Sequence, residues 1–176
     1  MNPARPDHFA LLSLPRSFRI DRAKLDLNYR TLQVVVHPDK FASRPAAEQR
    51  VAAARSADLN AAYQTLKSPA QRAQYLCDLQ AVTQDKTKER SLSAAFLMEQ
   101  MELREALADA KSESDQSVLK KLSGEVAATW QRAELDLSRF LDDERDLVAA
   151  QMKINEFMFL EKLLAEISDA QATLDS

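Results

Sequence analysis

The fold of this chain is decided by residues 25–45, LDLNYRTLQVVVHPDKFASRP. Before the histidine, apolar side chains recur at helical spacing on one stripe: Leu25, Tyr29, Leu32 and Val36. Two prolines, Pro38 and Pro45, then prevent a continuous helix from crossing the segment between them. A further apolar stripe follows the second proline: Leu59, Tyr63 and Leu66. The pattern therefore predicts a helical hairpin, with helices at about 22–36 and 46–66 and a stiff loop at its tip.

Cap and breaker residues extend this hairpin into a small helical domain. Asp21 can cap the first hairpin helix, and Asp7 can cap a short helix that precedes it. That short helix ends before Pro15, because a residue that precedes proline avoids the helical region. Ser68-Pro69 is typical of a helix start and opens a fourth helix to about residue 79.

The second half of the chain predicts long helices. Residues 70–176 contain no proline and a single glycine, and good helix formers dominate them. Polar residues 82–90 (VTQDKTKER) lack helical periodicity, so we expect a linker there, between domains at 1–81 and 91–176. Short connections between long amphipathic helices favour an antiparallel three-helix bundle, which makes the whole chain all-α.

The caps of the three long helices follow from their sequence. Ser91 or Ser93 can cap a helix to about residue 110, and a second helix covers about 118–141. Asp142 or Asp143 can cap the last helix, which runs to about residue 174. On that helix the main apolar stripe is Phe157, Leu160, Leu164 and Ile167.

Charge and composition exclude several classes of function. The first 79 residues carry 12 basic and 7 acidic side chains, whereas the remaining residues carry 12 and 20. This asymmetry suggests two parts with different partners. The basic residues form no clustered tract, which argues against nucleic acid as a partner. No apolar run approaches the roughly 20 residues of a membrane span, and no apolar targeting core follows Met1, so we expect a protein of the bacterial cytoplasm that binds no membrane.

The inventory of reactive residues is poor. One cysteine, Cys77, and two histidines are too few donors for a typical zinc site, so we expect no metal and no cofactor. Cys77 and Trp130 are interpreted as buried apolar residues. The carboxylate pair Asp142-Asp143 is better explained by helix capping than by acid–base chemistry, so an enzyme is disfavoured.

The tripeptide His37-Pro38-Asp39 lies at the tip of the predicted hairpin. There a proline would stiffen the loop and leave His37 and Asp39 pointing outward. Asp39 could then form a charge-assisted pair with an arginine of a partner protein. The alternative is a turn in which Asp39 caps backbone amides.

More of the first domain resembles a J domain. The segment 7–12 (DHFALL) resembles its opening helix, and its third and fourth helices are matched by Ala62, Tyr63, Leu66, Pro69, Arg72 and Tyr75. J domains stimulate ATP hydrolysis by DnaK-type chaperones and need the His-Pro-Asp tip to do so. The resemblance, together with the basic residues around the tip, implies these chaperone-binding residues: His37, Pro38, Asp39, Lys40, Arg22 and Arg30.

Three segments narrow the resemblance to the iron–sulfur co-chaperone family HscB, namely 37–43 (HPDKFAS), 72–76 (RAQYL) and 96–105 (FLMEQMELRE). In that family the J domain engages the chaperone HscA, and an acidic three-helix domain binds the scaffold IscU, which carries a nascent iron–sulfur cluster. The resemblance implies these scaffold-binding residues: Leu97, Met98, Met101, Glu102, Glu105 and Phe159.

Helical periodicity supports a second surface independently of any family. At about 100° per residue, Phe96, Leu103 and Leu107 cluster on one side of their helix, as a core stripe would. A second stripe lies toward the other side and carries Leu97, Met98 and Met101. Two apolar stripes imply that the helix packs against a second surface, which could belong to another helix, a dimer mate or a partner protein. For Met101 and Phe159, periodicity leaves the bundle core as an alternative.

One departure from the J-domain pattern bears on chaperone binding. J domains often carry a basic residue and an aromatic residue just before the histidine, where this chain has Val35 and Val36. Val36 continues the core stripe, but Val35 removes a positive charge. Two other functions remain open: a J-domain co-chaperone for a different client, with the second domain as a generic protein-binding module, and a purely structural helical adaptor.

Overall fold

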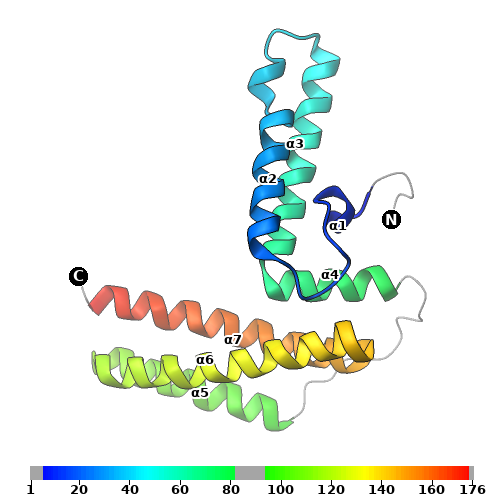
Figure 1. Cartoon of the computed structure of the whole chain (residues 1–176). Coiled ribbons are helices and arrows are strands. Elements are labelled where there is room, and N and C mark those ends of the chain that lie inside the picture. Colours follow the sequence, from blue (N-terminus) through cyan, green and yellow to red (C-terminus); the bar gives the residue numbers. More distant parts are fainter. Residues whose placement is uncertain (1–5, 82–93, 175–176) are drawn as a thin grey trace. The chain divides into compact units, whose positions relative to one another are not determined.

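The computed structural model describes residues 6–81 and 94–174, and within these ranges every regular element is a helix (Figure 1). The all-α prediction is therefore confirmed. Contacts divide the chain into two compact units, Met1–Leu76 and Cys77–Ser176. The predicted linker 82–90 lies outside the described residues, so the domain bounds 1–81 and 91–176 stay a prediction.

The first unit is built on the predicted hairpin. Its elements are α1 (His8–Leu11), α2 (Arg22–Val36), a 3₁₀ turn η1 (Pro38–Phe41), α3 (Ala46–Lys67) and the first part of α4 (Pro69–Ala81). Asp7 and Asp21 accept hydrogen bonds from the amides of Ala10 and Lys24, and so cap α1 and α2 as predicted. The Ser68 hydroxyl accepts one from the amide of Gln71, at the start of α4.

The core of this unit lies at the base of the hairpin, where α1 joins α2 and α3. Its fully buried side chains are Phe9, Leu12, Leu25, Ala62, Leu66 and Ala73. Farther along the predicted stripe of α2, Tyr29, Leu32 and Val36 are only half-buried. Only α2 and α3 extend toward the tip (Figure 1). Near the tip, the apolar stripe of each helix is therefore covered by the other helix alone. Tyr29 and Tyr63 stack at 4.0 Å and hold the two helices together.

A buried arginine joins α4 to the rest of the first unit. Arg72 is 6% exposed. Its Nε donates to the carbonyl of Phe18 at 2.8 Å and its Nη1 to the carbonyl of Leu66 at 2.6 Å. The guanidinium also lies 4.9 Å from the centre of the Phe18 ring. Because a buried charge costs free energy unless it is well hydrogen-bonded, these contacts are what allow the residue to stay inside.

We expect Arg72→Met to lower the free energy of unfolding by about 2–4 kcal/mol, since two buried carbonyls lose their donors. Arg50→Met is the matched control, because Arg50 is exposed on α3 and its Nε donates to the carbonyl of Ala46, one turn back on the same helix. Urea unfolding of the two full-length variants, followed by circular dichroism, measures the difference. Equal losses in the two variants would contradict the structural role of Arg72.

The second unit holds three long helices, α5 (Ala94–Ser112), α6 (Gln116–Ser138) and α7 (Leu147–Leu174). The helices alternate in direction (Figure 1), which confirms the antiparallel bundle. The side chains buried between them include Leu107, Leu119, Val126, Leu137, Ile154, Phe157, Leu160 and Ile167. The predicted stripe of α7 is shifted at one position, since Leu163 is fully buried and Leu164 only half-buried.

The start of α7 differs from the prediction. After α6 the chain continues as a π-helical turn η2 (Arg139–Glu144), which contains both Asp142 and Asp143. Arg145 then adopts a left-handed conformation, with φ of 56°. The cap is instead Asp146, whose Oδ1 accepts hydrogen bonds from the amides of Val148 and Ala149 at 3.0 Å. The predicted caps Asp142 and Asp143 were therefore wrong. The predicted caps Ser91 and Ser93 lie outside the described residues.

Candidate functional site

The His-Pro-Asp tip has a defined local geometry. α2 ends before His37, which is extended at φ −60° and ψ 127°, because the following proline disfavours a helical conformation at this position. Pro38 then begins the 3₁₀ turn η1. The His37 Nδ1 accepts a hydrogen bond from the amide of Asp39 at 3.3 Å and lies 3.6 Å from the Asp39 Oδ2. In this arrangement the neutral imidazole carries its proton on Nε2, which remains available as a donor.

The Asp39 carboxylate is almost fully in solvent. Its side chain is 89% exposed, and that of His37 is 49% exposed. The cap of this turn comes from His37 rather than from Asp39. Of the two alternatives for Asp39, the geometry therefore favours a carboxylate presented outward.

The basic residues predicted to assist the tip do not all gather there. Lys40 joins His37 and Asp39 around a shallow hollow that also includes Gln33 and Val34. Arg30 is exposed about two turns back along α2. Arg22, however, lies at the far end of the helix, fifteen positions and roughly 22 Å from His37.

Arg22 also has a structural role that the sequence did not indicate. Its Nη1 donates to the carbonyl of Lys67 at 2.9 Å, and its Nε lies 3.3 Å from the Asp26 Oδ1. The side chain thus ties the start of α2 to the end of α3. Its predicted part in chaperone binding stays a prediction, as does that of the residues around the tip.

Beside the tip lies an apolar surface that the sequence analysis had only partly identified. Val35 is 61% exposed and lines a hollow together with Val51 on α3, which is 50% exposed. Val34 is also 61% exposed but belongs to the separate hollow around His37. Val36 is half-buried, in agreement with its place on the core stripe. The signal for this surface was the run of three valines before His37, but the contribution of Val51 depends on how α3 lies beside α2.

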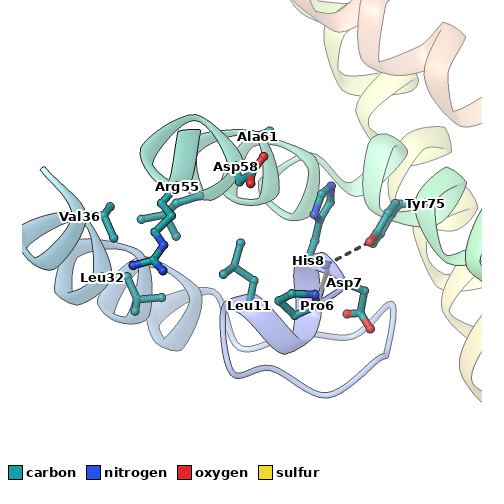
Figure 2. Close-up of a pocket in the computed structure, with 11 residues that line it drawn as sticks. Pro6, Asp7, His8, Leu11, Leu32, Val36, Arg55, Asp58, Ala61 and Tyr75 are labelled. Carbon is teal, nitrogen blue, oxygen red and sulfur yellow. Dashed lines mark hydrogen bonds between the residues drawn. The ribbon is translucent and has the colours of Figure 1, made fainter. Parts of the chain in front are cut away.

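A cavity of about 490 Å³ opens beside α1, against α2 and α3 (Figure 2). The His8 amide donates to the Tyr75 hydroxyl at 3.0 Å, and the two rings stack at 4.3 Å. Burial lowers the pKa of His8, opposed by the nearby carboxylates of Asp7 and Asp58. These contacts fasten α1 to α4, and none of the predicted site residues lines this cavity.

In the second unit, α5 presents the two stripes that periodicity predicted. Phe96 and Leu103 are half-buried and Leu107 is buried, on the side toward the bundle. On the other side the apolar side chains of Leu97, Met98 and Met101 are 45%, 63% and 72% exposed. The core alternative for Met101 is therefore wrong. The carboxylates Glu102 and Glu105 are also exposed.

Phe159 comes from α7 but lies next to α5. Its half-buried ring meets Phe96 edge-on at 6.1 Å between centroids, and the Arg104 guanidinium lies 5.6 Å from its centre. The same Arg104 is 3.4 Å from Glu166. Tertiary packing thus places Phe159 between α7 and α5, against Phe96 of the core stripe and beneath the exposed Arg104. We call Leu97, Met98, Met101, Glu102, Glu105 and Phe159 the α5/α7 surface.

The remaining sequence predictions concern buried residues and excluded sites. Cys77 is buried as predicted. Trp130 packs on Phe157 at 4.9 Å but is only half-buried. Within residues 6–81 and 94–174 no three His, Cys, Asp or Glu side chains lie in an arrangement that could hold a metal ion. None of the helices described there is long and apolar enough to cross a membrane.

Comparison with known proteins links both units to one family. A family model described as the HSCB C-terminal oligomerisation domain matches residues 92–168, and a DnaJ domain model matches residues 7–75. The Co-chaperone protein HscB homolog of Aromatoleum aromaticum is 38% identical over 170 residues, which cover 97% of this chain and 96% of the relative. The homolog from Bordetella pertussis is 39% identical over 168 residues, covering 96% and 98%.

Solved structures agree with the sequence relatives. Chaperone HscB from Vibrio cholerae superposes with a TM-score of 0.86 at 33% identity, covering 96% of this chain and 99% of the other. Human co-chaperone protein HscB superposes with a TM-score of 0.84 at 30% identity, covering 96% of this chain and 83% of the other.

Proposed function

The chain belongs to the HscB family of J-domain co-chaperones, and from this premise we propose that it stimulates the ATPase of an HscA-type chaperone and delivers an IscU-type iron–sulfur scaffold to it. In this proposal the His37-Pro38-Asp39 tip engages the chaperone, with Lys40, Arg30 and Arg22 assisting. The α5/α7 surface binds the scaffold. The chain itself would act in the cytoplasm, without a metal or cofactor of its own and without binding nucleic acid or membranes.

The observation that carries this proposal is the pair of exposed surfaces on separate units. The first unit presents a polar, capped tip in which the Asp39 carboxylate is 89% exposed. The second presents apolar side chains that the bundle does not bury, Met101 at 72% and Met98 at 63%. A chain with one surface of each kind can hold two partners at once. This is what a co-chaperone that links a client to its chaperone has to do.

The chemistry of the α5/α7 surface fits a protein partner. Apolar side chains at its centre would supply most of the binding free energy, and Glu102 and Glu105 would form a polar rim. Methionines adapt their shape to a partner because their side chains are unbranched. A scaffold surface with an apolar centre and basic residues around it would complement this arrangement.

Two measurements on the unmodified chain test the proposal. Calorimetry should detect binding of a purified IscU-type scaffold, and steady-state ATP hydrolysis by an HscA-type chaperone should rise with the chain and rise further with chain and scaffold together. ATPase stimulation without any scaffold binding would favour a J-domain co-chaperone for another client. The absence of both effects would leave only a structural adaptor.

Val35, two positions before the histidine, predicts a shallow dependence of chaperone binding on salt, because J domains often carry a basic residue there. Because Val35 is 61% exposed, Val35→Lys should leave the fold intact and add one positive charge beside the tip. The association rate with the chaperone should then fall more steeply with ionic strength than for the unmodified chain. Stopped-flow association between low and moderate salt measures this. An association rate unchanged at low salt would show that position 35 does not face the chaperone. Val118→Lys, at a 41% exposed position on α6, is the charge-matched control.

A further inference from the structure

We propose that the scaffold-binding surface extends beyond Phe159 along α7, over Met152 and Val148. This inference rests on the proposed function and adds binding residues to it. Met152 and Val148 are 59% and 63% exposed. The sequence analysis did not predict that these two residues form a surface, because a methionine and a valine on a long apolar helix are typical of a buried core.

The stripe on which they lie also packs against α5. One side of α7 is formed by residues that recur every three or four positions, most of them apolar: Val148, Met152, Asn155, Phe159, Leu163, Glu166 and Ala170. In its C-terminal half this side meets α5, where Leu163 is fully buried, Ala170 is 9% exposed and Glu166 lies 3.4 Å from Arg104. In its N-terminal half the same side exposes Met152 and Val148.

The register between α5 and α7 explains why this side of α7 is buried in its C-terminal half and exposed in its N-terminal half. Phe96 meets Phe159, and Arg104 meets Glu166, so α5 and α7 run in the same direction. Ala94, the first described residue of α5, therefore falls beside the turn of α7 that carries Phe159. The α7 residues before that turn extend past the described part of α5. This side of α7 thus continues uncovered by the described part of α5 for roughly 16 Å, from Phe159 past the polar Asn155 to Met152 and Val148.

The sequence that precedes α5 offers little to bury against this stripe. Residues 82–93, VTQDKTKERSLS, contain only Val82 and Leu92 as large apolar side chains. Burying Met152 and Val148 against a segment of this composition would gain little, because the hydrophobic gain scales with the apolar area removed from water. A partner that presents apolar side chains to Met152 and Val148, and a polar group to Asn155, fits this side of α7 better.

A scaffold bound to the α5/α7 surface needs a larger contact than that surface supplies. Specific protein complexes bury about 800 Å² on each partner and involve roughly 20–30 residues a side. The six residues of the α5/α7 surface are far fewer, so a scaffold bound there has to cover neighbouring residues as well. Met152 and Val148 lie about two and three turns before Phe159 on the same side of α7, with Asn155 between Phe159 and Met152. We therefore assign them to the same interface.

The test compares two methionines of one helix. Met152→Ser combined with Val148→Ser removes the proposed extension. Met158→Ser combined with Leu135→Ser is the matched control, because Met158 and Leu135 are 50% and 71% exposed and Met158 points about 120° away from Met152 around α7. Calorimetry with an IscU-type scaffold should show about tenfold weaker binding for the first pair and unchanged binding for the control pair.

Each other outcome overturns the inference. Unchanged binding by the first pair, while Leu97→Ala with Phe159→Ala still weakens binding, would confine the scaffold to the α5/α7 surface. Equal weakening of scaffold binding by both pairs of substitutions would show that the scaffold does not prefer this side of α7. A large drop in melting temperature for the first pair would mean that the chain itself covers these residues. If Leu97→Ala with Phe159→Ala also has no effect, the proposed function fails together with this inference.

Discussion

His37→Gln is expected to reduce stimulation of the chaperone ATPase to the basal rate while leaving the fold and scaffold binding intact. The His37 side chain is 49% exposed, so its replacement creates no cavity in the core. The Asp39 amide loses its acceptor, the His37 Nδ1 at 3.3 Å, but this hydrogen bond is at the surface, where water can replace it. What the variant loses is the imidazole presented to the chaperone. Steady-state ATP hydrolysis with and without the variant measures the effect.

A neighbouring substitution controls for general damage to the tip. Arg44 is exposed in the same loop, after the 3₁₀ turn. Arg44→Gln should keep most of the stimulation, and both variants should keep the helical circular dichroism of the unmodified chain. Full stimulation by His37→Gln would show that the tip is not the part that acts on the chaperone.

Replacing Leu97, Met98 and Phe159 together with alanine is expected to weaken scaffold binding by more than a hundredfold. Each of these side chains would be an interface anchor, with a contribution on the order of 2 kcal/mol to binding. Leu97 and Met98 are exposed, so their truncation should barely change the melting temperature. Phe159 also packs on Phe96, so a modest loss of stability comes from that residue. Calorimetry and thermal melting, followed by circular dichroism, separate the two effects.

Two further variants fix the interpretation of the triple change. Leu135→Ala, at a 71% exposed position on α6, should bind the scaffold normally. Phe157→Ala, at a fully buried position, should cost about 3–5 kcal/mol of stability. If the triple variant melts as early as Phe157→Ala, its residues belong to the core. If it is stable and binds the scaffold normally, the client site lies elsewhere.

The sequence was sufficient for features that depend on neighbouring residues. The hairpin followed from one apolar stripe and two prolines, and α2 begins after Asp21 and ends at Val36 as predicted. Angular periodicity placed Met98 and Met101 on a second stripe, away from the core stripe, and the structure shows that this stripe is exposed. Both are local properties of a helix, so they do not depend on the tertiary contacts that the rest of the chain makes.

Features that depend on distance or on local helix geometry were missed. Arg22 was grouped with His37 as one of the basic residues that assist the tip, but it lies fifteen positions away, at the other end of α2. Asp142 and Asp143 were typical cap residues, but a π-helical turn carries the chain past them to Asp146. The exposure of Met152 depends on where α5 lies beside α7, which a helical stripe by itself does not reveal.

The central claim is that one molecule links the scaffold to the chaperone through two surfaces, and a mixing experiment tests it most directly. The His37→Gln variant keeps the scaffold surface, and the variant with alanine at positions 97, 98 and 159 keeps the tip. The measured quantity is the extra ATP hydrolysis that scaffold adds to a reaction with an HscA-type chaperone. The unmodified chain should give this extra rate, and an equimolar mixture of the two variants should give none, because neither carries both surfaces. An extra rate restored in full by the mixture would contradict the claim that the two surfaces have to act in one chain.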